Sequence, residues 1–112
     1  MEKKFRYVLI NKDSKEVEKI IFISLSEIEQ GKLIEDLKKY DVLSRSQFTG
    51  QKDKENQEIY ENDSIEIKTN KKTYTAKIIF SQDHNGFKAF NEELNAFHNR
   101  FDNTCKIMKL YI

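Results

Sequence analysis

The sequence predicts an α+β fold: a small antiparallel β-barrel or strongly bent sheet with an SH3-like core, an N-terminal hairpin and one or two helices. Short β-prone runs follow one another with turn-forming residues between them, which favours hairpins and therefore antiparallel pairing. Of the 112 residues, 38% are hydrophobic, which suffices for one modest core. We therefore expect a single domain, with a hairpin and helix in residues 1–43 and a β-rich core in residues 44–112.

The first 43 residues predict the hairpin and the helix. Residues 5–10 and 17–23 are apolar and β-prone, and the polar residues 11–16 separate them. Ser24 and Glu27 have the spacing of a capping box, so we expect a helix to begin there. Gly31 interrupts the helical pattern. Two alternatives stay open: one helix kinked near Gly31, or a short turn followed by a helix over residues 32–40.

The remaining residues predict strands and one further helix. Apolar and polar residues alternate from residue 65 to 68 and from 73 to 80, and the Asn-Gly pair at 85–86 predicts a hairpin turn. We expect returning strands over residues 87–90 and 105–112. Phe90, Leu94, Phe97 and Phe101 recur at helical spacing, which predicts a helix over residues 91–100.

Composition argues against several functional classes. The net charge is +1, and 17 lysines stand against three arginines, so a dedicated nucleic-acid or anionic-membrane protein is not expected. Cys105 is the single cysteine, which excludes an internal disulfide and a cysteine-rich zinc site. No apolar run approaches the ~20 residues of a membrane span. These features predict a cytoplasmic protein with no membrane contact.

Candidate catalytic and metal-binding residues are few and poorly spaced. Cys105 lies beside Ile107 and Met108 and is expected to be a small buried hydrophobic residue. Zinc-type paired spacing is absent from the available ligands, which are Asp83, His84, Glu92, Glu93, His98 and Cys105. The three glycines lie far apart and form no phosphate-binding loop. We therefore predict a protein that is not an enzyme and needs no cofactor or metal.

Residues 47–63 are the most distinctive segment, and they read Gln-Phe-Thr-Gly-Gln-Lys-Asp-Lys-Glu-Asn-Gln-Glu-Ile-Tyr-Glu-Asn-Asp. This segment resembles the signature of the YopX family of small phage and prophage proteins, which runs roughly Tyr/Phe-Thr-Gly-Leu-Lys-Asp-Lys-Asn-Gly-Lys-Glu-Ile-Tyr-Glu-Gly-Asp-Ile. The matching residues are Phe48, Thr49, Gly50, Lys52, Asp53, Lys54, Glu58, Ile59, Tyr60, Glu61 and Asp63. The resemblance implies an origin on a phage or other mobile element, and it implies no biochemical activity.

Two departures from the signature indicate whether its role is structural or chemical. The family's Asn-Gly is Glu55-Asn56 here, and the family's Gly-Asp is Asn62-Asp63. Asparagine tolerates the left-handed conformation that glycine adopts freely, so both turns can persist. No reactive group is lost, which suggests a mainly structural signature. As the most specific feature, it still supplies the candidate partner-binding residues Phe48, Thr49, Gly50, Lys52, Asp53, Tyr60 and Asp63.

The leading functional hypothesis is binding to a host or phage protein. On this hypothesis the protein modulates or inhibits a host factor or a defence nuclease, and an anti-CRISPR-like role is one example. Of thirteen aromatic residues, four near the C-terminus are more than one small helix-and-strand face needs. An exposed aromatic patch is therefore one prediction for part of this set, which is Phe87, Phe90, Phe97 and Phe101. That patch serves either a protein partner or a homo-oligomer. The alternative is that these rings fill the core.

The second hypothesis is weak nucleic-acid binding. Residues 52–66 hold two lysines against six acidic residues, whereas residues 68–77 hold Lys68, Lys71, Lys72 and Lys77 with no acid. These four lysines fall on a predicted hairpin and are candidate phosphate contacts. The alternative is a solvated hairpin, because scarce arginine and a neutral total predict weak binding.

Overall fold

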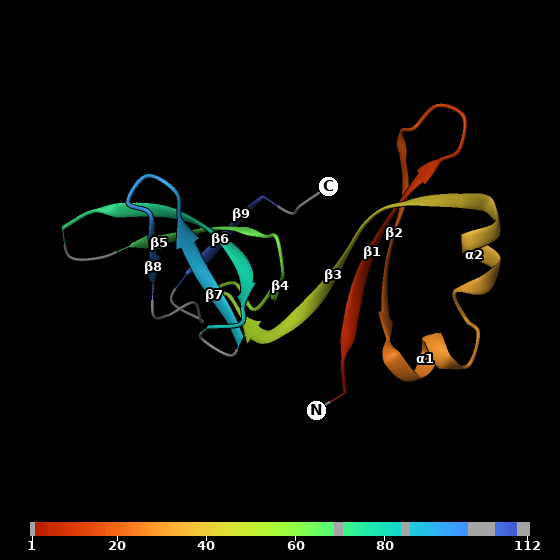
Figure 1. The fold of residues 1–112 in the computed structure, drawn as a ribbon, viewed down its shortest axis with the longest axis horizontal. Helices are drawn as coiled ribbons and strands as arrows, with labels where there is room; N and C mark the ends of the chain where they lie inside the picture. The colour runs from red at the N-terminus through yellow and green to blue at the C-terminus, as the bar shows by residue number, and fades with distance from the viewer. Residues whose placement is uncertain (1, 69–70, 84–85, 99–104, 110–112) are drawn as a thin grey trace. The chain divides into compact units, whose positions relative to one another are not determined.

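The computed structural model describes residues 2–68, 71–83, 86–98 and 105–109, and it divides into two compact units (Figure 1). The first unit covers Met1–Phe48 and the second covers Thr49–Tyr111. Strand β3, Tyr40–Lys52, begins in the first unit and ends in the second. The boundary between the two units therefore falls inside a strand. The sequence had instead predicted a single domain in which a hairpin and helix end at residue 43 and a β-rich core begins at residue 44.

The first unit is a three-stranded antiparallel sheet with two short helices. Central β1 (Lys4–Asn11) pairs with β2 (Val17–Ser24) and with β3, which confirms the N-terminal hairpin. Helices α1 (Leu25–Glu29) and α2 (Ile34–Lys39) connect β2 to β3. Alternate residues of β1 point to one side of the sheet and pack with residues of β2 and the helix region. This core consists of Phe5, Tyr7, Leu9, Ile23 and Leu33.

The predicted capping box is confirmed at the start of α1. The Ser24 hydroxyl accepts a hydrogen bond from the Glu27 amide (3.2 Å), and the Glu27 carboxylate accepts one from the Ser24 amide (3.1 Å). Gly31 has φ +81°, which lies in the left-handed region and cannot continue a helix. Neither alternative holds as stated, because two short helices lie on either side of a turn at Gly31; the helix expected over residues 32–40 is present as α2, which begins at Ile34.

The second unit is a five-stranded antiparallel sheet in the order β8-β7-β6-β5-β9. Its strands are β5 (Ser64–Lys68), β6 (Thr73–Ser81), β7 (Gly86–Asn91), β8 (Ala96–His98) and β9 (Lys106–Lys109). A further short strand, β4 (Glu58–Tyr60), pairs with β3. The core on one face of the sheet consists of Ile59, Ile65, Ala76, Ile78, Ala89, Cys105 and Ile107.

Two predictions about this unit need correction. The described strands form two open sheets rather than a closed barrel, so the SH3-like barrel is not found among the described residues. The helix predicted over residues 91–100 is wrong, because residues 92–95 form a turn and β8 follows. The helical spacing of Phe90 and Phe97 instead places them opposite each other across the β7–β8 hairpin. Residues 99–104, with Phe101, lie outside the described part of the chain.

Candidate functional site

The first half of the signature segment joins the end of β3 to β4. The Thr49 hydroxyl donates a hydrogen bond to the backbone carbonyl of Ile59 (2.8 Å), which ties the two strands together. Gly50 has φ +89°, a conformation in which a side chain is strained. Ile59 and Tyr60 are buried (0% and 1% exposed) and begin the second core. Thr49 and Gly50 therefore serve the backbone path into that core.

Asp53 is the buried centre of the signature turn, with an exposed fraction of 2%. Its Oδ1 accepts hydrogen bonds from the amides of Glu55 and Gln57 (both 2.9 Å), and its Oδ2 accepts one from the Ile107 amide in β9 (3.1 Å). Burial raises the pKa of Asp53, but the hydrogen bonds from the Gln57, Ile107 and Glu55 amides, together with Lys106, outweigh burial and lower it. Asp53 thus holds a turn and a distant strand in one place.

The second half of the signature forms a tight turn between β4 and β5. The Asp63 carboxylate accepts from the Tyr60 amide (2.8 Å). The backbone carbonyl of Asp63 accepts from the Ile78 amide (2.9 Å), and the Asn62 amide donates to the Ile78 carbonyl (2.8 Å). Asn62 has φ 74° and Asn56 has φ 65°, so both asparagines occupy the left-handed conformation expected where the family has glycine.

The structure places the seven signature candidates in different surroundings. Thr49, Asp53 and Asp63 direct polar atoms at backbone groups of the second unit. Tyr60 is buried, and its hydroxyl donates to the Glu58 carboxylate (3.1 Å). Phe48 lies under the ammonium group of Lys4, 4.9 Å from the ring centre, and Lys52 is exposed. These contacts favour a structural role for most of the signature.

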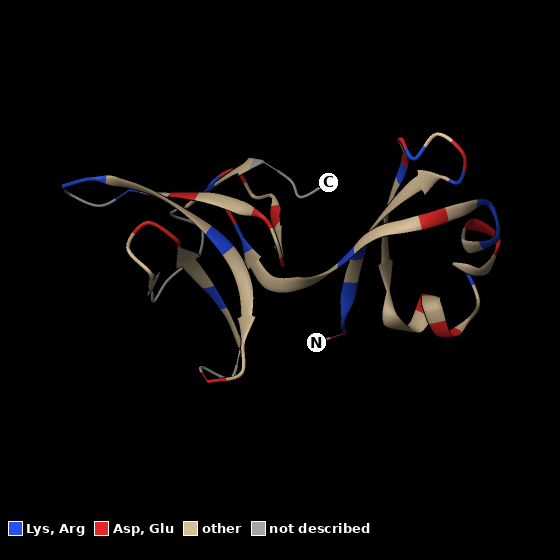
Figure 2. Ribbon diagram, turned by 45° about the horizontal axis from the view of Figure 1, so that its top comes forward, with Lys and Arg blue, Asp and Glu red and all other residues tan. Residues whose placement is uncertain are grey.

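The four candidate lysines lie along a projecting hairpin. The β5–β6 ladder runs on to the pair Lys68 and Thr73, whereas among the residues that the structure describes β9 pairs with β5 as far as Glu66. Strand β7 pairs with β6 only from Lys77 onward. The described residues 67–68 and 71–75 therefore extend past the neighbouring strands, and we call them the basic arm. Lys71 and Lys72 lie next to the turn of the arm and Lys77 follows it along β6. Figure 2 shows basic residues at the outer end of this hairpin.

Two of the lysines on the basic arm have nearby partners. The Lys68 ammonium lies 3.7 Å from the Glu66 carboxylate, with 64% of the Lys68 side chain exposed. The Lys72 ammonium lies 5.6 Å from the centre of the Tyr74 ring. An exposed ion pair of this kind contributes little to stability. The Lys68 side chain therefore remains largely exposed to solvent.

The structure separates the four aromatic candidates. Phe90 and Phe97 contact each other, with ring centres 5.1 Å apart and planes at 54°, and Phe97 is 38% exposed. Phe87 instead packs against the second core and meets Phe80 edge-on at 5.4 Å. Phe101 lies outside the described residues. Phe90 and Phe97, with the 52% exposed Leu94 in the turn between them, form a surface that we call the aromatic face.

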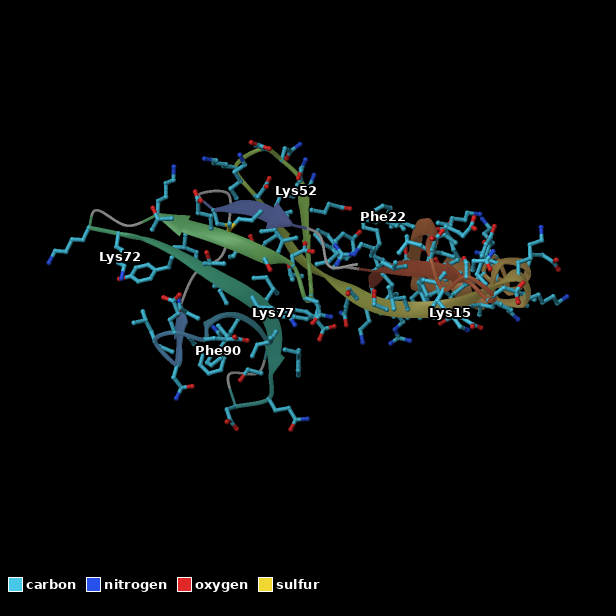
Figure 3. All side chains as sticks on the ribbon, turned by 90° about the horizontal axis from the view of Figure 1, so that it is seen from above. Lys15, Phe22, Lys52, Lys72, Lys77 and Phe90 are labelled. Atoms are coloured by element: carbon cyan, nitrogen blue, oxygen red, sulfur yellow. The ribbon has the colours of Figure 1, made fainter. Side chains whose placement is uncertain are left out.

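A groove of about 370 Å³ opens beside the basic arm. Its lining comes from the arm and β6 on one side and from the β7–β8 turn on the other. Lys72, Lys77 and Phe90 border this groove and are labelled in Figure 3. Glu92 and Glu93 bring two carboxylates from the turn to the same groove. The remaining lining residues are Ser64, Thr73, Tyr74, Thr75, Ala76 and Asn91.

Asn91 shapes one end of the groove and was missed by the sequence reasoning. It is 3% exposed, and its amide nitrogen donates to the Thr75 carbonyl in β6 (3.0 Å). Its amide oxygen accepts from the Leu94 backbone (2.9 Å), which starts the turn toward β8. Asparagine is a common turn residue, because its side chain can hydrogen-bond the backbone of residues that follow it. The turn was not predicted, because the helical spacing of the phenylalanines favoured a helix at this position.

The remaining candidate chemistry offers little. Cys105 is buried (2% exposed), as expected, and its backbone carbonyl accepts from the Lys54 amide. Within residues 2–68, 71–83, 86–98 and 105–109, no three His, Cys, Asp or Glu residues are grouped as metal ligands. His84 lies outside these ranges. Over the same ranges, no helix is long and apolar enough to cross a membrane.

Comparison with protein-family models identifies a family for this chain. The family model described as "YopX protein" matches residues 2–108, which is almost the whole chain. No curated protein matches the sequence. The match includes the signature turns built on Asp53 and Asp63, and Asn56 and Asn62, both at positive φ, stand where the signature has glycine. The chain therefore belongs to the YopX family.

Proposed function

We propose that this protein is a non-enzymatic binding protein whose aromatic face contacts a protein partner. The observation that carries the proposal is the contact between the half-buried Phe90 and the exposed Phe97, with exposed Leu94 in the turn between them, on a sheet whose other face already holds the core. Exposed aromatic side chains contribute strongly to protein interfaces when they become buried. A groove next to this pair gives a partner side chains a place to enter.

Charge favours a protein over a nucleic acid at this position. Glu92 and Glu93 line the groove together with Lys72 and Lys77, so the lining side chains carry no net charge. Two carboxylates beside Phe90 repel a phosphate backbone, whereas a protein partner can present charges of both signs. The whole chain, at +1, adds no general attraction for polyanions.

The kind of partner is inferred from the family resemblance. A phage or prophage origin favours a partner in the cytoplasm of a bacterial host, such as a host factor or a defence nuclease. The protein would modulate or inhibit it by occupying a surface rather than by turnover. A turnover activity that is lost on changing one polar residue would contradict this proposal.

Capture of partners by matched variants tests the proposal. The tagged wild-type chain and the Phe97→Ser variant are incubated with bacterial host lysate, with and without nuclease. Phe80→Ser is the control, because Phe80 is also exposed (51%) but lies outside the aromatic face. We expect one stoichiometric protein that survives nuclease, is retained by Phe80→Ser and is lost with Phe97→Ser. Recovery of the tagged chain with copies of itself alone would instead indicate a homo-oligomer.

The projection of the basic arm favours a second candidate, weak nucleic-acid binding. Lys68, Lys71 and Lys72 extend beyond the neighbouring strands, where they could contact phosphates without approaching Glu92 or Glu93. Binding of a single-stranded oligonucleotide should then fall steeply with salt and weaken in a Lys71→Glu plus Lys72→Glu variant. Binding that ignores salt would exclude this mechanism.

A further inference from the structure

We propose that the groove beside the basic arm binds an extended peptide of the protein partner as an added β-strand, with acidic side chains of the peptide against the arm. The inference rests on the proposed function and specifies how the partner is held. The peptide would lie along Thr73–Thr75 of β6, on the side where β7 has ended. Strand addition of this kind uses backbone hydrogen bonds for affinity and side-chain contacts for specificity.

The direction of the backbone groups in β6 supports this position. Ile78 exchanges backbone hydrogen bonds with Asn62 and Asp63, on the β5 side of the strand. The backbone of Thr75 faces the other side, because its carbonyl accepts from the Asn91 side chain. Successive residues of a strand present their N–H and C=O groups to opposite edges. Thr73 and Thr75 therefore turn these groups toward the groove, and Tyr74 and Ala76 turn theirs toward β5.

The β6–β7 ladder stops before it reaches these groups. It pairs Lys77–Ser81 with Gly86–Phe90, so Thr73 and Thr75 lie beyond its end. At that point the Asn91 side chain bonds to the Thr75 carbonyl, and the chain turns away through residues 92–95. The amide of Thr75 and both backbone groups of Thr73 consequently face the groove, and both residues are exposed. A short strand placed there would continue the line of β7.

The charges around the groove define the chemistry of its occupant. Lys68, Lys71 and Lys72 gather along the arm, whereas Glu92 and Glu93 lie at the turn. A peptide that spans the groove would match this polarity with acidic residues toward the arm and a basic residue toward the turn. Between them, a β-branched or aromatic residue opposite Tyr74 would cover its half-buried ring. The occupant is thus an extended peptide with an acidic end.

A displayed library of random seven-residue peptides, selected on the immobilised full chain, tests the inference. We expect enrichment of peptides with a β-prone centre and acidic residues at one end. Synthetic copies are then titrated against Thr75→Pro, which removes the amide that faces the groove. Proline is tolerated where a strand's N–H is not used in the sheet. Thr75→Val is the matched control, since it keeps that amide and loses only the hydroxyl.

The variants separate the backbone and charge contributions. Thr75→Pro should weaken binding about tenfold, as expected for one lost hydrogen bond, and Thr75→Val should bind like the wild type. Lys71→Glu plus Lys72→Glu should also weaken binding, whereas the same charge change at exposed Lys3 and Lys12 in the first unit should not. This charge variant remains informative if the proline variant folds poorly.

Three results would overturn the inference. One is equal affinity of the selected peptides for the wild type and a folded Thr75→Pro variant. Another is failure of the library to enrich any peptide. A third is displacement of bound peptide by a dT20 oligonucleotide in low salt, which would favour nucleic-acid binding by the basic arm. A captured partner that is lost with Phe97→Ser and retained with Thr75→Pro would leave the proposed function standing and refute strand addition alone.

Discussion

Asp53 organises the second unit through three backbone amides. A buried carboxylate is costly unless hydrogen bonds compensate for the lost water. Here Glu55, Gln57 and Ile107 supply those bonds, and Ile107 lies 54 residues further along the chain. One aspartate therefore closes a local turn and also holds β9 against the sheet. This double use explains why an aspartate is retained in the turn even though it takes part in no evident chemistry.

Replacing Asp53 with asparagine should destabilise the protein by about 2–3 kcal/mol. Asparagine keeps one oxygen for the amides of Glu55 and Gln57 but turns an NH₂ group toward the Ile107 amide, so two donors meet. Urea unfolding of the two proteins measures the difference. Asp13→Asn is the control, because Asp13 is exposed and its loss should change stability by less than about 0.5 kcal/mol. Equal effects of both substitutions would contradict this role for Asp53.

The pH dependence of stability should also report on Asp53. Its pKa is lower in the folded than in the unfolded chain, so the folded state binds fewer protons near that pKa. The stabilisation is therefore complete above the unfolded pKa of about 3.9 and is lost as the pH falls through the folded pKa. We expect the stability gap between the wild type and Asp53→Asn to narrow on acidification from about pH 5. A gap that stays constant to pH 3 would show that charge is not the cause.

Asn56 should tolerate glycine better than alanine. Its φ of 65° is accessible to glycine without strain and to asparagine at modest cost, but it is unfavourable for alanine. We expect Asn56→Gly to change the free energy of unfolding by less than about 0.5 kcal/mol and Asn56→Ala to lower it by about 1 kcal/mol. Thermal unfolding compares the two. Lys54→Ala controls for loss of a polar side chain, because Lys54 is exposed and lies two residues before Asn56 in the same turn.

The β7–β8 hairpin shows, at the scale of an element, where sequence periodicity fails. Phe90, Leu94 and Phe97 fit a helix by spacing, but the same spacing brings two phenylalanines into contact across a four-residue turn. Asn91 decides between the two structures, because its buried side chain closes the turn and bonds to β6. The strands around residues 65–68 and 73–80 were predictable, since alternation there coincides with one buried face.

The candidate site was predictable only in part, for the same reason. The basic residues Lys71 and Lys72 were visible as a run, and Phe90 and Phe97 as an aromatic excess. The groove between them depends on where β7 stops relative to β6, and pairing limits of this kind are set by long-range register. The backbone direction of Thr73 and Thr75 likewise has no sequence signal, because it follows from which neighbour Ile78 bonds to.

Asn91→Ala should release this hairpin. Alanine has no polar side-chain atoms, so the substitution removes both side-chain hydrogen bonds of Asn91. The Thr75 carbonyl and the Leu94 amide each lose that partner. We expect a loss of about 1–3 kcal/mol and faster amide hydrogen exchange in β8 and the turn. Asn91→Asp separates the two bonds, since aspartate can still accept from Leu94 but cannot donate to Thr75. Unchanged exchange in both variants would contradict the role of Asn91.

At the scale of the whole molecule, the chain contains two separate hydrophobic cores. The first is built on Phe5, Tyr7 and Leu9 of β1, the second on residues that include Ile65 and Ile78, and they share no residue. Each unit is small, and small units bury a limited share of their surface and are individually marginal. The basic arm, the groove and the aromatic face all belong to the second unit. The stability of that unit should therefore determine binding.

Substitutions in the two cores should act on different parts of the chain. Leu9 and Ile78 are both fully buried, so Leu9→Ala and Ile78→Ala should each cost about 2–5 kcal/mol. Because the cores share no residue, we expect Leu9→Ala to speed amide exchange mainly in β1 and β2, and Ile78→Ala mainly in β5, β6 and β7. Native-state hydrogen exchange followed by NMR measures both, and each variant controls for the other. Equal acceleration throughout the chain in either variant would show that the cores open together, and Leu9→Ala would then weaken peptide binding as strongly as Ile78→Ala.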